Sequence, residues 1–179
     1  IPFTGAPMSL LDIVSLPDPV LRRKARKVTV FDKELQTLID NMIHTMREAP
    51  GVGLAAPQVG ESIRLVVVEY PDTDDDEPDE DAPKKLYVMV NPEIVETSED
   101  KELGVEGCLS VPGLVGEVER HTRIVVKGLN RQGKPMKVKV KGWMARIFQH
   151  EIDHLDGIVF PDRATRVWQP REGEELPLD

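Results

Sequence analysis

The sequence predicts a single α+β domain. Two segments with helical periodicity, near residues 40 and 150, enclose a group of short strand-like segments. The strand-like segments cluster and do not alternate regularly with helices, which favours an α+β fold over a doubly wound parallel sheet. A chain of 179 residues is long enough for one domain with a core of its own.

The first helix is expected over residues 33–48. Its apolar residues recur at the three-four spacing of one buried stripe: Leu35, Leu38, Ile39, Met42, Ile43 and Met46. Asp32 can cap its start, and Pro50 and Gly51 follow its end. Residues 18–23 predict a turn that continues into a short helix.

Strands and a second helix are expected further along the chain. The strand-like segments are residues 64–70, 86–90, 93–96, 123–129 and 136–140. Met136, Val138 and Val140 alternate with lysines, which predicts a half-exposed strand paired in a hairpin with residues 123–129. The second helix is expected over residues 143–155, ended by Gly157.

The negative charge is concentrated in one segment. The net charge is −9, and eight acidic residues lie within residues 72–81. Such a run repels itself and buries nothing, so it predicts a solvated, mobile loop inserted between strands, with a cation site as the alternative.

Residues 1–7 resemble a cloning remnant before Met8, residues 8–165 form the expected domain, and residues 166–179 are expected to be a polar tail.

Composition excludes several classes of protein. The acidic balance argues against general nucleic-acid binding, which needs clustered Lys and Arg. No segment has the roughly 18 uncharged apolar residues of a membrane helix, and no secretory signal is recognisable. A single cysteine rules out an internal disulfide and suits the reducing cytoplasm, which is the expected location.

The clearest chemical signal is the sequence His150-Glu151-Ile152-Asp153-His154 in the second helix. Residues four apart lie on one helical face, so both imidazoles can reach one metal ion, with Glu151 beside them as a general base. An exposed helix that happens to carry two histidines is the alternative. Asp153 points away from the two histidines, and we predict an ion pair with Arg120; simple solvation of Asp153 is nearly as plausible.

A third metal ligand is needed for a catalytic site. Phe160 stands where a metzincin would have its third histidine, and the downstream glutamates lie in the polar tail. The remaining candidate is Cys108, the only thiol, although a lone cysteine can also be a small buried apolar residue. A third segment, Gly51-Val52-Gly53-Leu54-Ala55-Ala56-Pro57-Gln58, permits close backbone approach but is not a phosphate loop.

Together, three segments resemble the peptide deformylase family: residues 51–58, Glu106-Gly107-Cys108-Leu109-Ser110 and residues 149–155. The expected architecture is antiparallel or mixed sheets around a central helix that bears the His150–His154 motif, with an N-terminal amphipathic helix. The resemblance implies one catalytic domain that removes the formyl group from N-formylmethionyl nascent peptides. The ribosome surface is a further candidate partner.

The resemblance also implies roles for individual residues. Cys108, His150 and His154 would bind the metal, and Glu151 would carry the proton. The Gln58 amide and the Leu109 backbone N–H would stabilise the formyl oxygen, and Gly53 would pair with the peptide backbone. Fe²⁺ is implied as the physiological ion, with Zn²⁺, Ni²⁺ or Co²⁺ in a purified sample. A metalloprotease and a non-catalytic metal-binding module are the competing hypotheses.

Overall fold

Helices and strands form an α+β fold in which the two sheets are antiparallel. The computed structural model describes residues 9–73 and 78–172. Three α-helices lie in these residues: α1 (Lys33–Glu48), α2 (Gly142–Leu155) and the short α3 (Phe160–Arg163). The strands are β1 (Gly53–Ala55), β2 (Leu65–Pro71), β3 (Lys84–Thr97), β4 (Lys101–Gly107), β5 (Val115–His121), β6 (Arg123–Leu129), β7 (Pro135–Lys141) and β8 (Arg166–Trp168).

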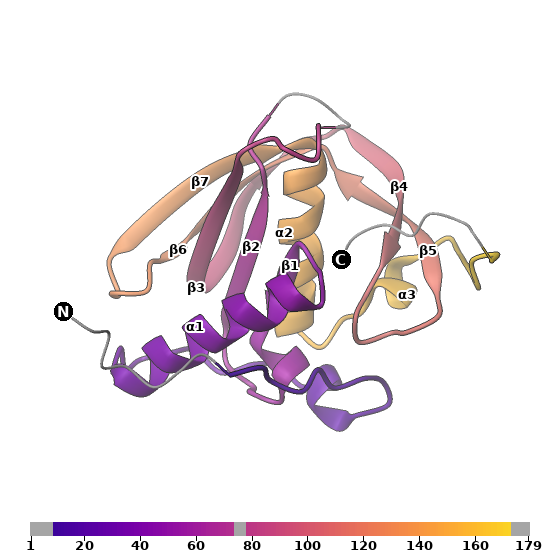
Figure 1. Cartoon of the computed structure of the whole chain (residues 1–179). Coiled ribbons are helices and arrows are strands. Elements are labelled where there is room, and N and C mark those ends of the chain that lie inside the picture. Colours follow the sequence, from indigo (N-terminus) through magenta and orange to yellow (C-terminus); the bar gives the residue numbers. More distant parts are fainter. Residues whose placement is uncertain (1–8, 74–77, 173–179) are drawn as a thin grey trace.

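The two sheets have different sizes and share helix α2 as a neighbour. The larger sheet has the order β1-β2-β3-β6-β7, and the smaller has the order β4-β5-β8. In chain order, β4 and β5 come between β3 and β6, so the chain leaves the larger sheet after β3 and returns to it at β6. Helix α2 contacts strands of both sheets, and α1 lies across one end of the fold (Figure 1).

Helix α1 forms because its apolar side chains lie on one face. Leu35, Ile39 and Met42 are buried against strands β1 and β2, in a cluster that also includes Leu54 and Val67. The Asp32 side chain accepts a hydrogen bond from the Leu35 backbone N–H at 2.9 Å, which satisfies one of the free donors at the helix start.

Strand β3 corrects one expectation from the sequence. Residues 86–90 and 93–96 were expected as two strands, but the structure has one bent strand of 14 residues. At the bend, Asn91 has a φ of 51°, a left-handed conformation that asparagine tolerates. Its side chain exchanges two hydrogen bonds with the Val28 backbone, at 2.8 and 2.9 Å. The first half of β3 pairs with β2 and the second half with β6.

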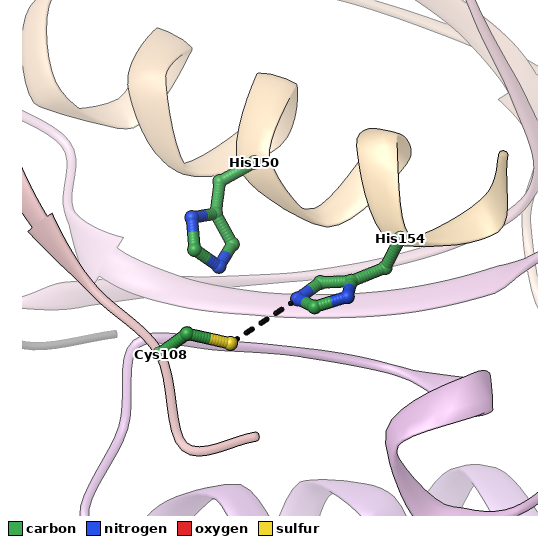
Figure 2. A group of neighbouring side chains, drawn as sticks. All are labelled: Cys108, His150 and His154. Atoms are coloured by element: carbon green, nitrogen blue, oxygen red, sulfur yellow. Dashed lines mark hydrogen bonds between the residues drawn. The ribbon is translucent and has the colours of Figure 1, made fainter. Parts of the chain in front are cut away.

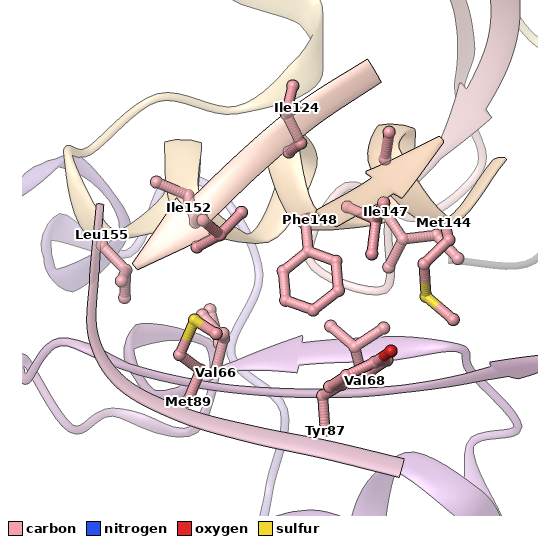
Figure 3. Close-up of a cluster of buried hydrophobic side chains, with 14 of the residues drawn as sticks. Val66, Val68, Tyr87, Met89, Ile124, Met144, Ile147, Phe148, Ile152 and Leu155 are labelled. Carbon is pink, nitrogen blue, oxygen red and sulfur yellow. The ribbon is translucent and has the colours of Figure 1, made fainter. Parts of the chain in front are cut away.

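Helix α2 is buried because both sheets cover it. Its residues Met144, Ile147, Phe148, Ile152 and Leu155 pack against the inner face of the larger sheet (Figure 3). The Phe148 ring meets the Tyr87 ring edge to face, with centroids 5.4 Å apart. A helix covered on so many sides is held in a fixed position, and it carries the His150–His154 motif.

The β6–β7 hairpin confirms the expected alternation. Met136, Val138 and Val140 pack on the main core, whereas Lys137, Lys139 and Lys141 are exposed. Residues 130–134 connect the two strands, and the Asn130 side chain accepts hydrogen bonds from the Gln132 and Lys134 backbone N–H groups. The period of two in this sequence therefore matches the pleat of an edge strand.

The acidic segment and the C-terminal segment lie partly outside the described residues. Of residues 72–81, positions 74–77 are outside, and Asp72, Asp79, Glu80 and Asp81 are exposed. The segment expected as a polar tail, 166–179, needs a correction because its first three residues form strand β8. Val167 pairs with Gly116 of β5, so this strand completes the smaller sheet. Residues 1–7, the expected cloning remnant, lie outside the described residues.

We expect the acidic segment to be dispensable. Pro71 pairs with Lys84, so residues 72–83 can be replaced by a two-residue Asn-Gly turn that suits a hairpin. Turnover and melting temperature should stay nearly unchanged at physiological salt, because the described acidic side chains are exposed. The ion pair of Asp72 with Lys85 is long, at 4.0 Å, and lies in solvent, so its loss should cost little. Differential scanning calorimetry of the original protein and of the shortened variant compares their melting temperatures. A clear fall in the variant's melting temperature would indicate that the segment packs or binds an ion.

Candidate metal centre

His150 and His154 lie one turn apart on α2 and point to the same side of the helix (Figure 2). Both are buried, with 6% and 1% of their surfaces exposed. Their rings meet edge to face, with centroids 5.1 Å apart. The four-residue spacing therefore brings two imidazoles to one place inside the protein.

Cys108 meets these imidazoles from the smaller sheet. It directly follows β4, just before the turn over residues 109–113, and it is buried. Its Sγ lies 3.4 Å from His154 Nε2 (Figure 2). One potential ligand atom from each of Cys108, His150 and His154 lies within 4.8 Å of the others. The structure thus brings together the three residues that the sequence suggested as metal ligands.

These donor atoms fit a divalent transition metal. Sulfur and nitrogen ligands at about 2.3 and 2.0 Å from a tetrahedral ion lie about 3.5 Å apart, close to the observed separation. Burial, with His150 nearby, holds the pKa of His154 well below its usual range. His154 is therefore neutral at neutral pH, which is the form that binds a metal.

Glu151 and Gly53 lie against each other. Glu151 directly follows His150 on α2 and is fully buried. Its side chain covers the Cα of Gly53, where an added Cβ would lie 2.5 Å from Glu151 Oε2. Gly53 begins strand β1, which pairs with β2 on one side only and forms the edge of the larger sheet.

Gln58 joins the Gly-rich segment to the cysteine. Its side chain is fully buried, and its Nε2 lies 3.7 Å from Cys108 Sγ and donates to Ser110 Oγ at 3.2 Å. Its Oε1 accepts a hydrogen bond from the Ala55 backbone N–H at 3.0 Å, which fixes the orientation of the amide. Leu109, half-buried, is the residue after Cys108. All three sequence segments singled out above therefore meet around Cys108.

The comparison with protein families agrees with this arrangement. Residues 10–169 match the family model described as polypeptide deformylase. The chain belongs to the polypeptide deformylase family. It is therefore a hydrolase, and its buried Cys/His/His cluster is that of a metal-dependent family. The matched residues include β8 and extend past residue 165, the expected end of the domain.

Curated peptide deformylases resemble the chain over nearly its whole length. The protein of Desulforudis audaxviator is 49% identical over 165 residues, which cover 92% of this chain and 100% of that protein. The protein of Halothermothrix orenii is 50% identical over 169 residues, which cover 94% of this chain and 99% of that protein.

Solved structures of peptide deformylases have the same fold. The Thermotoga maritima enzyme is 41% identical, with a TM-score of 0.78 over 88% of this chain and 99% of that chain. The Acinetobacter baumannii enzyme, solved with Met-Ala-Ser bound, is 42% identical, with a TM-score of 0.79 over 87% of this chain and 99% of that chain. In the described part of this deformylase-family chain, no helix is long and apolar enough to cross a membrane.

Glu106 is a site residue that the sequence analysis missed. Its Oε1 lies 2.9 Å from His150 Nδ1, so it holds the ring nitrogen opposite the one left for a metal. Arg120 donates to both carboxylate oxygens, at 2.9 and 2.8 Å, and Arg146 donates to Oε2 at 2.7 Å. Glu106 lies in β4, and Cys108 directly follows that strand two residues later. In extended backbone this spacing places two side chains on the same side, so it could have revealed Glu106.

The predicted ion pair between Arg120 and Asp153 is confirmed. Arg120 Nη1 donates to Asp153 Oδ2 at 2.6 Å, and Arg163 forms a second pair with the same carboxylate. Burial alone would raise the pKa of Glu106, but hydrogen bonds from Arg120 and His150 outweigh it and hold that pKa well below its usual range. Glu106 is therefore ionised, and these charges tie β4 and β5 to α2 in the deformylase-family fold.

Proposed function

We propose that the chain removes the formyl group from the N-formylmethionyl start of newly made polypeptides. The observation that carries this proposal is the buried Cys108, His150 and His154 cluster, with the Glu151 carboxylate on the adjacent helical position of a deformylase-family chain. The related Acinetobacter enzyme solved with Met-Ala-Ser bound supports methionine as the first residue of the product peptide.

The three ligands would hold one divalent ion at the junction of α2 and β4. Such an ion polarises a water molecule and lowers its pKa toward neutrality. Thiolate and imidazole suit both iron and zinc, so ligand type alone does not select the ion. We propose Fe²⁺ as the physiological metal, with Zn²⁺, Ni²⁺ or Co²⁺ as substitutes in a purified sample.

Glu151 would carry the proton through the reaction. Its carboxylate accepts a proton as water oxygen bonds to the formyl carbon, and it later donates that proton to the amine nitrogen. The carbon–nitrogen bond then breaks, and formate and a free methionyl amine leave. Because one group acts first as base and then as acid, no second titratable side chain is required.

Gln58 and Leu109 would stabilise the negative charge that develops on the formyl oxygen. The Gln58 amide is held beside Cys108 by the Ala55 N–H, so it needs no rearrangement during the reaction. The Leu109 backbone N–H would be the second donor. Gly53, at the free edge of β1, would pair with the extended peptide backbone as an added strand.

Two further proposals concern the setting of the reaction. Residues 8–165, extended by β8, would form the catalytic domain. A cytoplasmic location, with the ribosome surface as a candidate partner, suits a substrate that emerges from protein synthesis. A thiolate ligand also needs the reducing conditions of that compartment.

The proposed activity is tested with a formyl-Met-Ala-Ser peptide and its acetyl counterpart. We expect release of formate from the first peptide and no hydrolysis of the second, because a close-walled site admits only the smaller acyl group. A metalloprotease would instead cut an internal peptide bond, and a non-catalytic metal-binding module would cut neither. Mass spectrometry of the products separates these outcomes.

Metal analysis tests the ligand set. We expect about one ion per chain in the purified protein and loss of that ion in Cys108→Ser and in His154→Ala, because an open four-coordinate site needs all three protein ligands. His44→Gln on α1 is the matched control, and it should keep the ion. Retention of the metal by Cys108→Ser would show that the cysteine is not a ligand.

A further inference from the structure

The Glu151 side chain occupies the space in which a Cβ of residue 53 would lie. A Cβ added at Gly53 would lie 2.5 Å from Glu151 Oε2 and 2.9 Å from both Cδ and Cγ. All three nearest atoms belong to Glu151. These separations are well below the 3.5–4.0 Å of favourable carbon contacts, so an alanine and the present Glu151 conformation exclude each other.

Backbone conformation does not explain why residue 53 is glycine. The described glycines with positive φ are Gly60, Gly113, Gly133, Gly142 and Gly157, and Gly53 is not among them. Gly53 pairs in regular antiparallel register with Val68 of β2. An L-residue could therefore adopt this backbone, and space for the Glu151 side chain is the remaining requirement.

We propose that Gly53 is a positioning residue for the Glu151 carboxylate. The absence of a Cβ creates the space that the carboxylate occupies, so strand β1 sets where the proton carrier lies. This role rests on the proposed function of Glu151. It is separate from the proposed pairing of the Gly53 backbone with substrate, which uses N–H and C=O groups that an alanine also has.

The packed surroundings of Glu151 mean that its carboxylate cannot be displaced without a cost. Glu151 is fully buried, and α2 is fixed between the two sheets. An alanine at position 53 would therefore be accommodated by rotation of the Glu151 side chain, which moves its carboxylate by about 1 Å to restore an ordinary contact distance. A misplacement of about 1 Å can cost a catalytic group about 100-fold in rate.

The kinetic test is Gly53→Ala assayed with the formyl-Met-Ala-Ser peptide. We expect kcat to fall about 100-fold, with KM and metal content unchanged. In the Glu151→Ala background, adding Gly53→Ala should lower the residual kcat no further, because the group on which it acts is absent. A raised KM with unchanged kcat would show that Gly53 acts on the peptide and would overturn the proposal.

The second test needs no turnover and uses urea unfolding of the metal-free protein. Gly53→Ala should lower the folding equilibrium constant about tenfold when Glu151 is present, and much less in the Glu151→Ala background. Gly128→Ala is the matched control, because its added Cβ would crowd Met89 and the Val90 carbonyl, far from Glu151 in sequence and contacts. The loss of stability caused by Gly128→Ala should be the same with Glu151 present and in the Glu151→Ala background.

An equal loss of stability from Gly53→Ala in both backgrounds would overturn the proposal. If Gly53→Ala does not fold, the double variant with Glu151→Ala decides: a folded double variant supports the proposal, and an unfolded one refutes it. Full activity of Glu151→Ala alone would contradict the proposed function, a result that the unfolding measurements do not depend on.

Discussion

Replacing Glu151 with alanine is expected to lower kcat by about 10²–10⁴-fold, the usual contribution of a positioned acid–base group. The metal should stay bound, because Cys108, His150 and His154 all remain. Glu151→Gln should behave in the same way, since it keeps the shape of the side chain and loses only the ability to carry a proton.

Two measurements on the same samples check this prediction: formate release and metal content per chain. His44→Gln, which changes a side chain on α1, serves as the control and should retain both. If Glu151→Ala loses its metal, the carboxylate helps to bind or hold the ion, and its role as a proton carrier alone is wrong.

Replacing Arg120 with methionine is expected to destabilise the protein by about 3–5 kcal/mol, the usual loss when one partner of a buried ion pair is removed. Arg120 is 5% exposed and donates to both Glu106 and Asp153. Arg146 and His150 still contact Glu106 in the variant, so we expect the lower end of that range. Metal affinity should also fall by about tenfold or more, because Glu106 orients His150.

Comparison with other variants separates the buried cluster from ordinary surface charge. Arg22→Met removes an ion pair with Asp162 whose side chains are 48% and 38% exposed, and it should cost no more than about 1 kcal/mol. Asp153→Asn should cost less than Arg120→Met, and the two losses should not add. Strictly additive losses in urea unfolding would contradict a shared network.

Helices and strands with one apolar face were predicted correctly from the sequence. In the β6–β7 hairpin, valines and lysines alternate with the period of the pleat, and the observed strands match the expected ranges closely. Helix α1 covers the residues of the expected apolar stripe, because that stripe is buried in one hydrophobic cluster with residues of β1 and β2.

Strands β4 and β5 were missed because their inward faces include buried charged residues. Glu106 and Arg120 are buried where an amphipathic pattern would place apolar residues, and Gly104 leaves its space to the Arg146 guanidinium. Each of these charges is satisfied only by a partner distant in sequence. A pattern search within one strand cannot detect them, and the contribution of Glu106 to the metal centre was overlooked for the same reason.

The Cys108 and His154 donor atoms belong to residues 46 positions apart in the chain, so they meet only after the smaller sheet has packed on α2. A metal ion held by all three donors would therefore bind the native state more tightly than the unfolded chain, in which these donors are not held together. Mass action then links metal supply to the folding equilibrium. Above saturation, each tenfold rise in free metal adds about 1.4 kcal/mol to the stability, so the cell's metal supply helps to set the lifetime of the folded protein.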